Sequence, residues 1–407
     1  MSLAPYPYLR PTLLLLGAAL LCAACQSSTE PAPPAPPTTT PPREAAPPAT
    51  PDAPEPGTTP ASAPGEEPTA THHEEAELEP AADAAPATHP TLAFGEDWGP
   101  ISDDQRQRLA AVPWDDPPER LDAIKEDHVD KHFLWSDERN PHLFGPHIRD
   151  LHGAYVGIGT DQSYLFVGWQ RPHLAWFIDY DPWVVWLHHA YFAFIESSPD
   201  AQAFMALFAD REAGLALLET FYQNHPNRAD ILKVFREARS GVHRRLRTIQ
   251  RDFAKSDLPT FLTDADTYDF IRQLIRNGRA HTLLGNLLSD RALLGIGRAC
   301  AELQVPVRVL YLSNAEQYWS YPQQFKDNML GLPFDARSVV LRTAATKPHN
   351  EDYRYALQPG AVFHTWLRLD RVRSVRQLSR RVRVTGLDDF PFTIDDRLPT
   401  PEDGLAE

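Results

Sequence analysis

A glycine-rich turn is the first group of residues that could do chemistry. Gly157 and Gly159 follow a short apolar run, residues 154–156. Glycine has no Cβ, so a backbone can turn tightly there and approach a ligand. Asp161 and Gln162 follow the second glycine and are candidate ligand-binding residues. A strand before and a helix after this turn would be typical of a nucleotide-type site, and the alternative is a purely structural turn.

An acid about twenty residues later suits the same kind of site. Asp179 ends the apolar run 173–178, and a carboxylate at the carboxyl end of a strand can accept hydrogen bonds from two ribose hydroxyls. Asp181 stands two positions on and precedes Pro182, which is typical of a helix cap followed by proline in the first turn. We therefore expect Asp179 to bind a ligand and Asp181 to cap a helix, although both could belong to a solvated loop.

A polar cluster follows another apolar run, residues 307–312. Its members are Ser313, Asn314, Glu316 and Tyr318. Because ligands bind at the carboxyl ends of strands in open α/β sheets, we expect this cluster to face the same crevice as Asp161, Gln162 and Asp179. Glu316 is a candidate general base, and Tyr318 is a candidate hydrogen-bond donor. The alternative is that Ser313 and Asn314 cap the next helix.

The hydrophobic pattern predicts the elements that position these residues. Apolar runs predict strands at 154–158, 173–178, 282–285, 307–312, 338–342 and 362–367. Helical periodicity is expected over 103–112, 118–135, 162–169, 183–196 and 289–304, and it dominates from 200 to 277. Strands that alternate with helices predict one Rossmann-like α/β domain over 91–407, with a mostly parallel sheet and helices on both faces. The helical block at about 183–280 would then be an insertion.

Three stretches together resemble a little-characterised family of bacterial lipoproteins and secreted proteins with a methyltransferase-like Rossmann domain. They are residues 156–162, the apolar run that ends at Asp179, and residues 310–318. The resemblance implies that Gly157, Gly159 and Asp179 bind S-adenosylmethionine (SAM). Tyr155 stands where methyltransferases usually have an acid, and Asp161 replaces the third glycine. Two functions stay open: a SAM-dependent methyltransferase, and a binding protein that keeps the fold without the cofactor.

The N-terminal residues predict export and a lipid anchor. Arg10 precedes an apolar run and small residues that end at Cys25, which resembles a lipoprotein signal peptide over 1–24 with lipid modification of Cys25. The alternative is an ordinary secreted protein cut after Ala24. Residues 26–90 hold 18 of the 40 prolines and 11 acidic residues against one basic residue. Residues 25–90 are therefore expected to form a disordered acidic tether. By resemblance to lipoprotein sorting, Gln26 favours the outer membrane of the cell envelope.

The net charge, the histidines and the cysteines limit the kinds of partner and site that are expected. The net charge of −16 gives no reason to expect nucleic acid, so we expect a lipid bilayer and an unknown small molecule or envelope component as partners. His128 and His132 lack the following Glu of a zinc-peptidase helix, and no metal site is expected. Cys300 lies in an apolar helical pattern and should be a buried small hydrophobe. The arginines from 371 to 383 are expected on the polar face of a terminal helix.

Overall fold

The computed structural model describes residues 98–122, 129–345, 352–379, 392–400 and 403. The expected signal peptide, Cys25 and the tether lie outside these residues. Among the residues described, no helix combines the length and the apolar character that crossing a bilayer requires.

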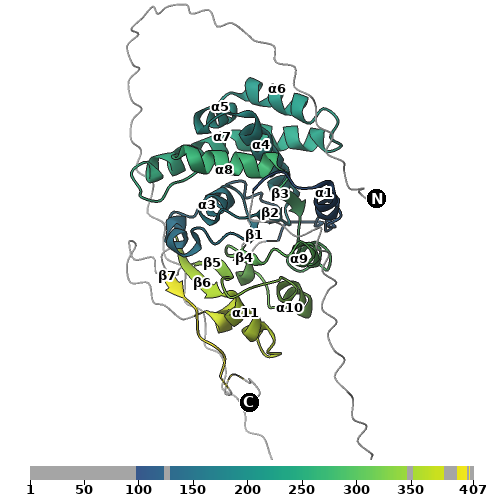
Figure 1. Cartoon of the computed structure of the whole chain (residues 1–407), viewed down its shortest axis with the longest axis vertical. Coiled ribbons are helices and arrows are strands. Elements are labelled where there is room, and N and C mark those ends of the chain that lie inside the picture. Colours follow the sequence, from purple (N-terminus) through teal and green to yellow (C-terminus); the bar gives the residue numbers. More distant parts are fainter. Residues whose placement is uncertain (1–97, 123–128, 346–351, 380–391, 401–402, 404–407) are drawn as a thin grey trace, which may run out of the picture. The chain divides into compact units, whose positions relative to one another are not determined.

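A mixed sheet lies at the centre of the described chain (Figure 1). Its strand order is β3-β2-β1-β4-β5-β6-β7. Strands β1 to β5 are parallel, β6 is antiparallel to β5, and β7 is parallel to β6. The strands are β1 (Ala154–Ile158), β2 (Leu174–Asp179), β3 (Ala280–Leu284), β4 (Val307–Tyr311), β5 (Val339–Ala345), β6 (Tyr353–Pro359) and β7 (Phe392–Ile394). The expected α/β fold with a mostly parallel sheet is confirmed.

Helices cover both faces of the sheet because the strands bury side chains on both. On β1, Tyr155 packs into one hydrophobic cluster and the adjacent Val156 into the other. On β2, Phe177 packs into the first cluster and the adjacent Trp176 into the second. This alternation is the two-residue period of a strand. The first face is covered by α3 (Asp161–Gln170) and the helical insertion, and the second by α1 (Asp103–Ala110), α9 (Ala292–Glu302), α10 (Gln323–Leu330) and α11 (Gly360–Leu367).

The insertion between β2 and β3 forms most of one helical layer. Its helices are α4 (Pro182–Ser197), α5 (Ala201–Ala209), α6 (Arg211–Phe221), α7 (Arg228–Phe253) and α8 (Ala265–Arg276). Figure 1 shows these teal and green helices together along one side of the sheet. Four of them begin at an aspartate whose side chain accepts a hydrogen bond from the first turn: Asp181, Asp200, Asp210 and Asp264. Such caps satisfy amide groups that have no partner within the helix.

The segment 362–367, expected as a strand, is helix α11. Its buried residues Val362, Phe363, Trp366 and Leu367 form two adjacent pairs four positions apart. That spacing places them on one side of a helix, whereas a strand would alternate buried and exposed positions. The prediction of a strand was therefore wrong because a short apolar run was assigned without regard to its period.

Other boundaries also differ from the sequence expectations. The described parts of 118–135 contain no helix, and α12 (Val375–Leu378) is a single short turn in place of a longer terminal helix. Arg380, Arg381 and Arg383 lie outside the described residues. Helix α9 begins at Ala292, not near Ser289, and strands β6 and β7 were not anticipated.

Cys300 is fully buried on α9. Burial raises the pKa of its thiol to about 12. A thiol with such a pKa stays protonated at neutral pH and is a poor nucleophile, which fits the expected hydrophobic packing role.

Candidate functional site

The strand order reverses between β1 and β4, which makes the carboxyl ends of these two strands a topological switch point. Strands β2 and β3 continue from β1 in one direction, and β5 continues from β4 in the other. Open α/β sheets bind ligands in the crevice outside such a reversal. The glycine turn follows β1 and Ser313 follows β4, so both sequence-predicted groups lie at this edge.

The glycine turn and Asp179 contact each other directly. The backbone N–H of Gly159 donates to Asp179 Oδ2 at 3.0 Å, and the N–H of Asp181 donates to Oδ1 at 3.0 Å. Burial raises the pKa of Asp179 to about 7, although these amide donors act in the opposite direction. Both oxygens that could hold a ribose therefore accept hydrogen bonds from the chain itself.

Gly157 and Gly159 are required for different structural reasons. Gly159 has φ of +83°, in the region that favours glycine. A Cβ on Gly157 would lie 2.1 Å from the hydroxyl oxygen of Tyr155, so this glycine makes room for a tyrosine of the same strand. Asp181 caps α4 and also accepts from His132 Nδ1 at 2.9 Å. The capping role expected for Asp181 is present.

Asp161 and Gln162 point into the protein. Asp161 is fully buried, and Arg245 Nε of α7 donates to its Oδ2 at 2.8 Å. The N–H of Ser136 donates to Asp161 Oδ1 at 2.7 Å. Gln162 Nε2 lies 3.4 Å from the hydroxyl of Tyr311 on β4. These side chains thus join the turn to α7, to residues before β1 and to the neighbouring strand.

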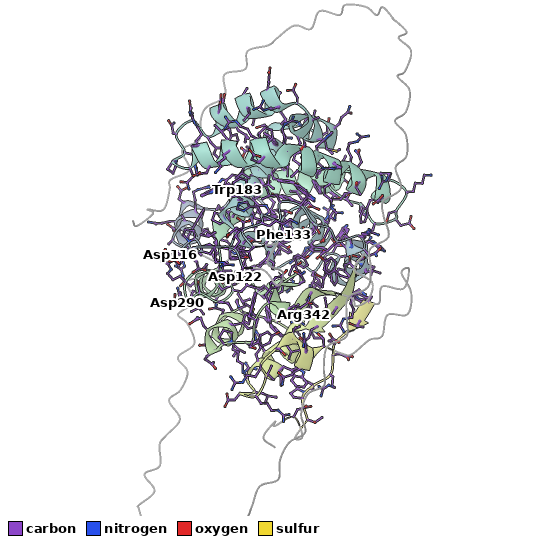
Figure 2. All side chains as sticks on the ribbon, turned by 180° about the vertical axis from the view of Figure 1, so that it is seen from behind. Asp116, Asp122, Phe133, Trp183, Asp290 and Arg342 are labelled. Atoms are coloured by element: carbon purple, nitrogen blue, oxygen red, sulfur yellow. The ribbon has the colours of Figure 1, made fainter. Side chains whose placement is uncertain are left out.

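Residues 129–140, here called the edge segment, cross the carboxyl edge of the sheet. Its contacts run from the end of β2, through the turn after β1, to β4, β5 and β6. They are made by His132 with Asp181, by Ser136 with Asp161, by Glu138 with β4 and β5, by Arg139 with Asp352, and by Asn140 with Tyr355. Figure 2 labels Phe133 of this segment between Trp183 of α4 and Arg342 of β5.

Glu138 of the edge segment occupies the switch point. It is 2 % exposed, and its Oε1 accepts hydrogen bonds from Tyr311 at 2.5 Å, Ser313 at 3.1 Å and Thr343 at 3.1 Å. Among the described residues, Oε2 has no hydrogen-bond partner. Burial raises the pKa of this carboxyl to about 7 against the lowering effect of the three hydroxyl donors. No local sequence signal marks Glu138, because all three donors lie more than 170 positions away.

A cavity of about 370 Å³ lies on the other side of Ser313. The lining residues are Ser313, Asn314, Glu316, Gln317, Arg342, Thr343, Ala344, Arg354, Ala356, Val375, Arg376 and Ser379. The structure therefore divides the sequence-predicted residues: Ser313, Asn314 and Glu316 line this cavity, and the glycine turn and Asp179 do not. Ser313 adopts φ of 47°, in the left-handed region, so its turn is locally strained. Tyr318 is 42 % exposed and lies outside the lining.

Glu316, the candidate general base, forms a buried ion pair. Arg342 Nε donates to its Oε2 at 2.6 Å, and the hydroxyl of Tyr321 donates to its Oε1. Both side chains of the pair are almost fully buried. The carboxylate is thus held by the protein and contributes to the cavity wall as the partner of Arg342.

Comparison with known proteins identifies the domain. No curated protein matches this chain. A family model described as a domain of unknown function (DUF7790) matches residues 133–391, more than half of the chain. The matched range begins within the edge segment and includes the insertion and every residue that lines the cavity. The chain therefore belongs to the DUF7790 family.

Proposed function

We propose that the protein is a lipid-anchored binding protein of the bacterial cell envelope that takes a small anionic molecule in the cavity beside Ser313. The observation that carries this proposal is the charge of the lining, which holds three arginines and one carboxylate. Glu316 neutralises Arg342 and the carboxylate of Asp395 acts on Arg354, so Arg376 supplies the remaining positive charge of the lining. Guanidinium groups bind carboxylates and phosphates through paired, charge-assisted hydrogen bonds.

The volume of the cavity and its uncharged polar lining groups limit the size and polarity of the ligand. A volume of about 370 Å³ falls at the small end of ligand pockets, about 300–1,000 Å³. Ser313, Asn314 and Gln317 supply hydroxyl and amide groups that can fix the orientation of a polar ligand. A compact carboxylate or phosphate compound meets both conditions.

The alternative, an active SAM-dependent methyltransferase, has its own support because Gly159 and Asp179 meet at the expected edge. SAM would bind there with Asp179 on the ribose, and Glu316 or Tyr318 would act at the reacting centre. Glu138 occupies the switch point, and both oxygens of Asp179 accept backbone hydrogen bonds. The edge segment would have to leave before SAM could enter, which favours a binding protein that keeps the fold without the cofactor.

Calorimetry on the full-length protein separates the two functions. The titrants are citrate, inorganic phosphate and S-adenosylhomocysteine, each used alone. We expect citrate or phosphate to bind, and we expect Arg376→Gln to weaken that binding by about tenfold or more, because it removes a charged donor from the lining. Arg368→Gln is the matched control, since Arg368 is an exposed arginine at the end of α11 outside the lining.

Two results would count against the anion proposal. Absence of binding by citrate and phosphate at millimolar concentration rejects the cavity as an anion site. Binding of S-adenosylhomocysteine that is lost in Asp179→Ala supports the methyltransferase instead.

A further inference from the structure

Helix α7 carries a line of cations on the side that faces solvent. Its opposite side is buried against the insertion and the sheet through residues that include Ile231, Phe235, Val242, Leu246 and Ile249. The exposed cations on this side are Lys233, Arg236, Arg244, Arg247 and Arg251, and one exposed acid, Glu237, lies among them four residues after Lys233. Successive members, with the exposed Ser240 between Arg236 and Arg244, are three or four residues apart. This spacing places them on one face of a helix, in a line of about 27 Å at 1.5 Å per residue.

The charges along this line are poorly compensated. Like charges three or four residues apart on a helix destabilise it. Lys233 lies over the ring of Trp183 at 5.0 Å, and Arg251 pairs with its exposed neighbour Asp252. Within the described part of the chain, Arg236, Arg244 and Arg247 make no ion pair and no hydrogen bond through their side chains.

The chain as a whole is acidic, so this line is not a general property of its surface. The net charge is −16, whereas α7 holds eight cations against three acids. His243, on the same helix, has its pKa lowered by partial burial and by Arg247 and Arg239. The field around α7 is therefore positive, and an external anionic partner would relieve the repulsion.

We infer that the exposed face of α7 binds the anionic phosphate groups of a phospholipid surface. A straight line of cations about 27 Å long matches many headgroups in a plane, whereas a small anion would contact one or two of them. Lipid anchors hold proteins stably when a second signal, such as a basic patch, supplements them. The expected lipid on Cys25 would supply the first signal. This inference does not depend on the ligand of the cavity.

The experiment is vesicle flotation of the full chain with Cys25→Ala, so that no lipid anchor contributes. The vesicles are phosphatidylcholine with or without phosphatidylglycerol. We expect flotation only with phosphatidylglycerol at low salt, and loss of flotation at about 1 M salt, where charges are screened beyond about 3 Å. Each Arg near an anionic surface contributes about fivefold to binding. The triple variant Arg236→Gln, Arg244→Gln, Arg247→Gln should therefore bind about 100-fold more weakly.

The matched control is Arg120→Gln, Arg298→Gln, Arg368→Gln. These three exposed arginines lie outside α7, and their replacement changes the net charge by the same amount. The control should bind like the parent protein. Equal binding by the two triple variants, or no flotation of the parent at low salt, overturns the inference. Flotation gained only after deletion of residues 26–90 assigns the face to that acidic segment, and preferential binding of a DNA duplex assigns it to nucleic acid.

Discussion

Arg245 Nε lies 2.8 Å from Asp161 Oδ2 and joins the helical insertion to the first residue of α3. The same guanidinium donates through Nη2 to the backbone oxygen of Glu138 at 2.9 Å. Arg245 thus links the insertion both to the turn after β1 and to the edge segment, and His188 of α4 adds a second link to that turn through the backbone oxygen of Gly159 at 2.8 Å.

Replacement of Arg245 should destabilise the protein strongly. Arg245→Met leaves the fully buried Asp161 without its ion-pair partner, and such a loss costs about 3–5 kcal/mol in the free energy of unfolding. Urea denaturation measures it. Arg244→Met is the control, because the neighbouring Arg244 is exposed and should change stability by less than about 0.5 kcal/mol. Equal effects of the two changes would show that the pair is not important for stability.

Glu138 should contribute stability that falls as pH rises. Its pKa is about 7 in the fold and ordinarily 4.5, so the folded state holds the proton more tightly than the unfolded state. The contribution is complete below about pH 4.5 and is lost as pH rises through about 7. Buried His188, His189 and His281, whose pKa values are lowered to about 4, 3 and 4, act in the opposite direction, so we expect the stability of the parent protein to decrease relative to that of Glu138→Gln between pH 5 and about pH 8.

Variants test the assignment of this pH dependence. Glu138→Gln should remove a pH-dependent contribution of on the order of 3 kcal/mol across the range, since one pKa unit corresponds to about 1.4 kcal/mol. The remaining slope is assigned to Asp179, whose pKa is also about 7, and to the buried histidines, whose lowered pKa values act with the opposite sign. Asp137→Asn, an exposed neighbour, should leave the slope unchanged. A slope that is identical in Glu138→Gln and the parent protein would falsify the assignment.

The buried ion pair of Glu316 and Arg342 should affect the stability of the fold as a unit. Arg342→Met leaves Glu316 as an unpaired buried carboxylate and should cost about 3–5 kcal/mol. The double variant Glu316→Leu, Arg342→Met removes both charges and should recover a large part of that loss. Thermal or urea denaturation gives both values. If the double variant is no more stable than the single one, the pair does not behave as an isolated ion pair.

Replacement of Cys25 should release the protein from membranes. Cys25→Ala removes the expected site of lipid modification, so the chain should move from the membrane pellet to the soluble fraction after a high-salt wash that removes charge-based binding. Cys300→Ala is the control, because Cys300 is buried in the domain and should not affect fractionation. The mass of the N-terminal peptide provides a second measurement. An unlipidated peptide that starts at Cys25 would favour the ordinary secreted form.

The strands with strong local signals could be predicted from the sequence. The bounds of β1 were predicted without error, and those of β2, β4 and β5 were predicted within a few residues, because buried parallel strands appear as continuous apolar runs. Strand β6 was missed although Tyr353, Tyr355 and Leu357 alternate with other residues. That alternation was a usable signal for a strand.

The candidate site was harder to predict than the fold. The meeting of Gly159 and Asp179 at one edge followed from strand–turn patterns. The role of Glu138 did not, since Tyr311, Ser313 and Thr343 lie 173, 175 and 205 positions away. A carboxylate in a loop belongs to no hydrophobic repeat, so sequence periodicity does not predict that it reaches the crevice. The cavity depends in the same way on arginines from two strands and a short helix.

The path of residues 129–140 has a consequence for the order of folding. Arg139 and Asn140 contact Asp352, more than 200 positions later, so these bonds close a very long loop of the chain. Contacts that close such long loops form late. The edge segment should therefore be among the last parts to dock during refolding.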